Sequence, residues 1–280
     1  MISPPVFPRC QLWLLLPLLV ASRVAAAQQP PDGPGPSWSP ITDRFALSAI
    51  YSNGRVSTSG HLDPSPTLGG TEVSMEHDLG LTPNAHQGRV ELMIHFANRW
   101  RVRIDYLDLT RQATVSLARP ITFGADQFNV GDMVSTKFNW QQMNITPTYA
   151  LIQNQRLEFG LGLGVHLFEM DMLGQVPSRG LSQEFTGAGP YPSVAADGVW
   201  RISRRWAVTA RANYLNLSVN GYNGEYEDWH GDVQFRAQAN FSIGAGFEST
   251  TIAFSDTKST PTGEAQMRII GPELRLRASF

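Results

Sequence analysis

The chain has 280 residues, of which 42% are hydrophobic and only 16% are charged, whereas about a quarter of the residues are charged in ordinary soluble domains. Its 22 lysine and arginine residues against 24 acidic residues leave a net charge of −2, which excludes the basic surplus typical of nucleic-acid-binding proteins. The length allows one large β domain or two small domains.

The N-terminus predicts an export signal. Arg9 precedes the apolar run LWLLLPLLVA (12–21), and AAA (25–27) offers a small-residue cleavage site. The run is shorter than the roughly 20 residues of a membrane-spanning helix, which disfavours the alternative of an uncleaved anchor. We therefore expect a signal peptide over 1–27, cleaved near Ala27. Cleavage would remove Cys10, the only cysteine, and leave a chain without disulfides in an oxidising compartment.

Residues 28–42, QQPPDGPGPSWSPIT, are rich in proline and glycine and predict a linker. From residue 43 to residue 280 the sequence alternates between apolar and polar residues with a period of two, which is typical of β-strands. We expect a single all-β domain over 43–280. Ten strands are predicted, at about 44–57, 87–97, 100–112, 134–152, 156–171, 189–201, 205–218, 228–238, 240–255 and 266–280.

The alternation slips in the fourth predicted strand, 134–152. Phe138 and Trp140 share one parity, whereas Met143 and its apolar successors share the other. Two residues facing one on the partner strand would restore a single apolar face. The sequence therefore predicts a β-bulge near Gln141–Gln142.

Short and long connections alternate along the chain, and both termini of the predicted domain fall at the short-connection end. This order is typical of membrane barrels, which have short turns on one side and long loops on the other. The segment 71–81 lies in the first long connection, and the sequence leaves its role open. Short connections are expected at 97–99, 153–155, 203–205 and 239, and long ones at 58–86, 113–133, 172–188, 219–227 and 256–265.

Aromatic residues mark the ends of the apolar faces. Trp206 and Tyr214 are eight residues apart on one face, which is roughly 26 Å along a strand and about 20 Å after a 40° tilt. This is close to the ~25 Å apolar band, with its aromatic girdles, of transmembrane barrels. A soluble barrel with an oily interior gives the same alternation, but the strand number, the connections and these aromatics favour lipid. The predicted girdle residues are Trp100, Tyr106, Trp206 and Tyr214.

The chain ends with GPELRLRASF, in which Leu274, Leu276 and Phe280 lie on one face of the last strand. This ending resembles the C-terminal strand of bacterial outer-membrane β-barrel proteins, of the small OmpA or porin type. The resemblance implies a closed antiparallel up-and-down transmembrane barrel of about ten strands (eight or twelve as alternatives) in the outer membrane of a Gram-negative cell. It also implies that Leu274, Leu276 and Phe280 form the signal for the barrel-assembly machinery.

A barrel of ten strands leaves little free lumen, because eight strands are already filled by their own side chains. Buried charges must be paired, so we expect a salt-bridged, largely plugged lumen, crowded enough to need the glycines of the polar faces. His95, Lys137, His166 and Asp232 are also assigned to the inner face. The predicted lumen charge network is Glu91, Arg101, Arg103, Asp105, Glu158, Arg211, Arg236, Glu248, Glu273, Arg275 and Arg277.

The function expected from these features is structural or surface-interacting, without catalytic residues, cofactor or metal. Expected partners are outer-membrane lipid, lipopolysaccharide and the assembly machinery, with no nucleic acid, and the protein is expected to be a monomer. One alternative is a narrow channel for small or hydrophobic solutes. The other is an outer-membrane hydrolase acting on lipid A or peptide, for which His61, His77, His86 and His230 lie near the predicted outer loops, among Asp63, Asp78, Asp228 and Ser74.

Overall fold

The computed structural model describes residues 40–63, 69–123, 126–219, 221–256 and 262–280. The predicted signal peptide and nearly all of the predicted linker therefore lie outside the described residues. Within the described ranges the only helix is a single 3₁₀ turn, η1 (Pro177–Arg179), and no helix there is long and apolar enough to cross a membrane.

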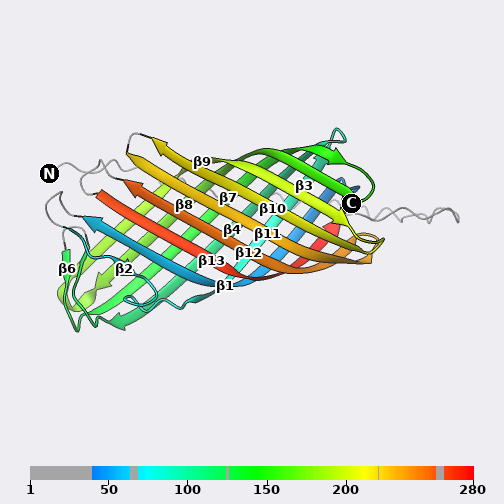
Figure 1. The fold of residues 1–280 in the computed structure, drawn as a ribbon. Coiled ribbons are helices and arrows are strands. Elements are labelled where there is room, and N and C mark those ends of the chain that lie inside the picture. The colour runs from blue at the N-terminus through cyan, green and yellow to red at the C-terminus, as the bar shows by residue number, and fades with distance from the viewer. Residues whose placement is uncertain (1–39, 64–68, 124–125, 220, 257–261) are drawn as a thin grey trace, which may run out of the picture. The chain divides into compact units, whose positions relative to one another are not determined.

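Ten long antiparallel strands follow one another around a closed barrel (Figure 1). Closure comes from the first and last strands, which pair from Ala46 opposite Ser279 to Asp63 opposite Thr262. The predicted fold and strand count are confirmed. The barrel strands are β1 (Phe45–Asp63), β3 (Asn84–Phe96), β4 (Trp100–Ser116), β7 (Met133–Gln153), β8 (Leu157–Val176), β9 (Leu181–Arg201), β10 (Trp206–Val219), β11 (Tyr222–Gln238), β12 (Phe241–Asp256) and β13 (Thr262–Ser279).

Three short strands lie outside the barrel wall. β2 (Val73–Ser74) pairs with β1 beyond the first residue of β3, and β5 (Ile121–Phe123) pairs with β6 (Asp126–Phe128) in a small hairpin. All three belong to the long connections at one end of the barrel, here called the loop end. The four short connections lie at the opposite end, called the turn end.

Two of the predicted long connections are largely strand. β8 and β9 continue through most of 172–188 and leave only η1 and Gly180 between them, and β11 begins at Tyr222 rather than near residue 228. The prediction was wrong because these residues have mixed polarity, and backbone hydrogen bonds between neighbouring strands can form without an apolar face.

The predicted bulge at Gln141–Gln142 is also wrong. β4 and β7 keep one register from Trp100–Tyr149 to Ser116–Met133, and the irregularity in β7 lies between Ala150 and Ile152, opposite β8. Phe138 and Trp140 therefore share the inner face with Gln142, and both aromatic side chains are fully buried. The alternation of apolar and polar residues changes along this strand because the barrel interior itself becomes apolar toward the loop end.

The outer wall carries the apolar side chains, as the alternation predicted. Leu163, Val194 and Leu274 are 68%, 59% and 58% exposed, values that a soluble fold would not give to a whole wall of such residues. The exposed large apolar side chains include Phe45, Leu47, Tyr51, Val90, Leu161, Leu163, Val165, Val194, Trp200, Val233, Ile243, Phe247, Leu274 and Leu276.

Inward-facing glycines let neighbouring strands and lumen side chains approach closely. A Cβ atom on Gly160 would lie 2.6 Å from a carboxylate oxygen of Asp197. A Cβ on Gly246 would collide with the backbone oxygen of Gly231, which cannot move aside without breaking the sheet. The glycines of β8 and β12 thus make room in a narrow interior.

Candidate functional site

The barrel interior has two layers of different chemistry. The half next to the turn end is lined by charged side chains, and the half next to the loop end is lined by apolar and aromatic ones. All eleven residues of the predicted lumen network are buried on the inner face.

The floor of the charged layer is built around Asp43, which precedes β1. Its carboxylate accepts hydrogen bonds from Arg236 Nη2 at 2.5 Å and from Arg277 Nη2 at 3.2 Å. Close by in the same layer, Arg101 pairs with Glu158 and lies 3.6 Å from Asp197. The floor therefore joins residues from five strands with Asp43, which precedes β1.

The centre of the charged layer is organised by Glu91 of β3. Its two carboxylate oxygens accept from Arg211 of β10 and, at 2.7 Å, from Arg275 of β13. Arg275 also lies 3.4 Å from Asp232. β10 lies opposite β3 in the strand order, so the Arg211–Glu91 pair spans the lumen, whereas β13 is separated from β3 only by β1.

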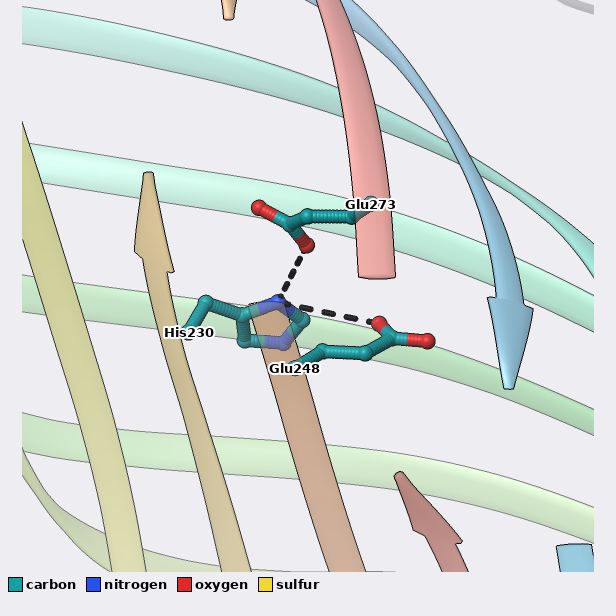
Figure 2. A group of neighbouring side chains, drawn as sticks. All are labelled: His230, Glu248 and Glu273. Carbon is teal, nitrogen blue, oxygen red and sulfur yellow. Dashed lines mark hydrogen bonds and ion pairs between the residues drawn. The ribbon is translucent and has the colours of Figure 1, made fainter. Parts of the chain in front are cut away.

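Figure 2 shows the neighbouring group formed by His230, Glu248 and Glu273. His230 Nδ1 donates to Glu273 at 2.7 Å and lies 3.7 Å from Glu248. Nε2 faces Asp228 at 3.2 Å and Arg89 at 3.0 Å. The imidazole therefore links the acidic side chains of β11, β12 and β13.

This group also has the ligand types of a metal site, since one ligand atom from each of its three side chains lies within 4.8 Å of the others. The guanidinium of Arg89 competes with a cation there, at 3.0 Å from His230 and 3.8 Å from Glu248. The donor set is thus already organised as an ion-pair network, which agrees with the chemistry of the surrounding layer.

A layer of rings and amides separates the charged from the apolar half. His166 Nδ1 donates to Asn144 Oδ1 at 2.6 Å, and its Nε2 faces the Ser193 hydroxyl at 2.7 Å. Its ring stacks on Tyr191 at 4.8 Å, and Tyr226 lies 4.6 Å away. The interior at this level is filled by side chains.

The apolar layer is completed by the outer segment, defined here as residues 69–83. Its buried side chains join an apolar cluster that includes Phe138 and Trp140 from the barrel wall. Glu76 fixes the segment, because it accepts from Arg111 Nη2 of β4 and from the backbone N–H of Thr58, both at 2.7 Å. The segment side chains in the cluster are Val73, Met75, Leu79 and Leu81.

A second ion pair holds the exposed side of the outer segment. Arg119 donates from Nε and Nη2 to the two carboxylate oxygens of Asp78, at 2.9 and 2.6 Å. These hydrogen bonds, helped by one from the backbone of Ser74, hold the pKa of Asp78 well below its ordinary value of 3.8. Asp78 is therefore ionised at physiological pH.

Of the hydrolase residues suggested by the sequence, His77 and Asp78 meet, with His77 Nδ1 3.3 Å from Asp78 Oδ1. His77 is 89% exposed, and Ser74 Oγ accepts from the His77 backbone N–H at 3.2 Å. His230, expected near an outer loop, is instead buried in the lumen, because β11 extends upstream to Tyr222. His86 lies on β3, where its ring accepts from or donates to Tyr51.

The remaining predicted residues can be compared with the faces on which they lie. Trp100, Tyr106, Trp206 and Tyr214 are exposed on the outer wall, as are Leu274, Leu276 and the terminal Phe280. Lys137, expected inside, lies on the outer face because β7 keeps one frame. His95 is only partly buried.

The sequence reasoning missed three acidic residues of the interior. Asp43 is the first residue after the predicted linker, Asp197 is not singled out, and Asp228 is grouped with the residues near the outer loops although it begins the predicted strand 228–238. Asp228 shares the even parity of Asp232 and Arg236, and that parity alone would have placed it on the inner face. No comparable signal marks Asp43, whose partners come from β11 and β13.

Comparison with solved structures supports the fold. The outer membrane protease OmpT from Escherichia coli is similar with a TM-score of 0.51 and 9% identity, over 84% of this chain and 97% of that one. The attachment invasion locus protein Ail of Yersinia pestis is similar over 82% and 98%, with 13% identity and a TM-score of 0.33. The toluene transporter TodX of P. putida is similar over 87% and 91%, with 8% identity and a TM-score of 0.36.

No family model matches the sequence, and no curated protein matches it either. The similarity to OmpT therefore concerns the fold alone.

Proposed function

We propose that this chain, which has the fold of an outer-membrane β-barrel, is inserted in the outer membrane of a Gram-negative cell as a barrel with a closed lumen and a structural or surface-interacting role. The apolar outer wall supports insertion, since lipid solvates such a wall and a closed barrel satisfies every backbone group of its strands. The turn end and both ends of the barrel domain would face the periplasm, and the loop end would face outward.

The observation that carries the proposal is closure of the lumen at two levels. Glu91 bridges Arg211 and Arg275 across the charged layer, and Glu76 holds the outer segment against Arg111 in the apolar layer. Breaking a buried pair by removing one partner costs about 3–5 kcal/mol, so the lower closure should not open by thermal motion. Solutes then have no continuous polar path through the barrel.

The absence of conduction can be measured with the refolded mature chain in planar bilayers. The wild type should show no steady current, whereas a wide porin reconstituted alongside should conduct. Glu76→Gln releases only the upper closure and should stay silent, because the lower pairs remain. Reproducible steady currents through the wild type would refute the closed lumen and favour the channel alternative.

A second candidate function is the binding of a small hydrophobic compound at the loop end. An apolar cavity of about 40 Å³ lies between the outer segment, the β5–β6 hairpin and the wall. Small-molecule sites are likewise lined mainly by apolar side chains. The cavity is lined by Val73, Leu79, Leu117, Ile121, Phe128, Val134, Thr136, Met172, Gly174 and Gln183.

Saturation-transfer NMR of naphthalene with the protein in nanodiscs tests this candidate. Leu79→Arg would place a charge in the cavity and should abolish the protein-dependent signal. The exposed control His77→Gln, in the same segment, should leave it unchanged. Equal signals from both variants would show that naphthalene partitions only into the lipid.

A further inference from the structure

A polar cavity of about 40 Å³ lies in the charged layer, on the turn-end side of the His230 group. Five arginines and three carboxylates line it, so its lining is rich in cations although the whole chain carries a net charge of −2. The charged lining residues are Arg101, Arg103, Arg211, Arg275, Arg277, Glu91, Asp197 and Asp232.

Four of these arginines have carboxylate partners. Arg211 and Arg275 share Glu91, Arg101 pairs with Glu158, and Arg277 pairs with Asp43. Arg275 also lies 3.4 Å from Asp232, and Arg101 lies 3.6 Å from Asp197. Each of these four arginines therefore has at least one carboxylate as counter-charge.

Arg103 differs from its neighbours in the cavity. Its side chain is 94% buried, yet no carboxylate of the described residues lies within ion-pair distance of it, and its Nη2 has no hydrogen-bond partner there. A buried guanidinium without a counter-charge is strongly unfavourable in a low-dielectric interior. Arg103 is one of the side chains that line the polar cavity.

We propose that this cavity binds a small oxyanion, such as inorganic phosphate, with Arg103 as its principal ligand. The guanidinium presents planar, forked donors that match the oxygens of a phosphate or carboxylate. Arg101 and Arg277, which line the same cavity, add positive potential at its turn-end side. The anion thus supplies the counter-charge that the described part of the chain does not.

The charge distribution along the barrel axis fixes where such an anion can sit and from which side it arrives. Beyond the cavity toward the loop end, Arg89 lies among Asp105, Asp228 and Glu248, and this acidic layer repels anions. Toward the turn end, Gln234 lines both this cavity and a second hollow that reaches turn residues of the β9–β10 connection. That hollow is itself basic, being lined by Arg201, Arg204, Arg205 and Arg236.

Equilibrium dialysis of ³²P-labelled phosphate against the refolded mature chain in nanodiscs, at constant ionic strength in chloride, tests the proposal. The wild type should bind one phosphate per chain with saturation. Arg103→Gln should weaken binding at least tenfold, and Arg103→Lys should lie between the two, because it keeps the charge but not the fork. Arg156→Gln, in the exposed β7–β8 turn, is the matched control and should bind like the wild type.

Thermal unfolding provides a second readout that distinguishes a lost ligand from a damaged barrel. Phosphate should raise the melting temperature of the wild type, since a ligand that binds only the folded state stabilises it. Arg103→Gln should melt at the same temperature with and without phosphate, and without phosphate it should be at least as stable as the wild type. Failure of the wild type to saturate, or equal phosphate affinity of Arg103→Gln, would overturn the proposal.

Discussion

Asp43 and Arg236 are separated by 193 residues in the sequence, yet Asp43 Oδ2 and Arg236 Nη2 lie 2.5 Å apart in the barrel floor. A second contact, 3.1 Å from Arg236 Nη1 to Asp43 Oδ1, makes the pair bidentate. The contact ties the residues that precede β1 to β11, on which Arg236 lies. Because Arg277 of β13 joins the same carboxylate, the first and last strands meet there through side chains as well as through their backbone.

Asp43→Asn should destabilise the barrel strongly. The substitution leaves two buried guanidinium groups, Arg236 and Arg277, without their carboxylate, and the loss of one partner of a buried pair costs about 3–5 kcal/mol. Urea unfolding in lipid vesicles, followed by heat-modifiable electrophoretic mobility, measures this. Glu227→Gln, on the exposed face of β11, is the control and should be nearly neutral. An Asp43→Asn variant as stable as the control would show that the floor pair contributes no stability.

The outer segment should keep its structure as the pH falls from 7 to about 4. The pKa of Asp78 is lowered in the folded state, so the stabilisation from its ion pair is fully present above the unfolded value of 3.8 and is lost only as the pH falls further, through the folded pKa. Hydrogen–deuterium exchange of residues 69–83, corrected for intrinsic rates, should show constant protection down to pH 4 and loss below it.

Asp78→Asn should remove that protection already at pH 7, because the amide cannot replace the charge that Arg119 contacts. Asp132→Asn, which breaks the pair with Arg179 in another connection, is the control and should leave 69–83 protected. Loss of protection between pH 7 and 5 in the wild type would contradict the assigned role of Asp78.

Gly246→Ala should impair folding, whereas Gly174→Ala should be tolerated. The added methyl group would collide with the backbone of Gly231 in the first case and meets no atom within 4 Å in the second. Overpacking of a tight interior costs about 1–3 kcal/mol. The yield of refolded, heat-modifiable protein measures the difference. Equal yields would mean that the strands can separate enough at Gly246 to admit a side chain.

Leu163→Arg tests whether lipid surrounds the outer wall. A charge near the bilayer midplane on the lipid face costs about 2–4 kcal/mol, and Leu163 is 68% exposed in the apolar part of β8. Val130→Arg, in the connection between β6 and β7, lies at the loop end and should have little effect. Folding free energies in vesicles should therefore separate the two variants, and equal values would place water against the β8 wall.

The strand pattern and its sidedness could be predicted because both depend on local alternation. Alternate residues of a strand face opposite sides of the sheet, so each side meets a single environment. Arg211 and Trp206 can therefore be assigned to opposite faces even when their contacts are unknown. The prediction failed at Phe138 and Trp140, where the interior is apolar and the alternation loses its contrast. It failed again at residues 222–227, upstream of the predicted start of β11, where the strand continues through residues of mixed polarity.

By itself, then, the sequence determined an antiparallel barrel of ten strands with an apolar wall, since period-two polarity and alternating connection lengths are written in neighbouring residues. Only the tertiary structure decided which charges meet. The partners of Asp43, Glu91 and Glu76 come from distant strands whose register around the closed barrel is fixed by backbone pairing. The tertiary structure also shows that no carboxylate of the described residues pairs with Arg103 beside the polar cavity, because the partners of a side chain depend on three-dimensional packing.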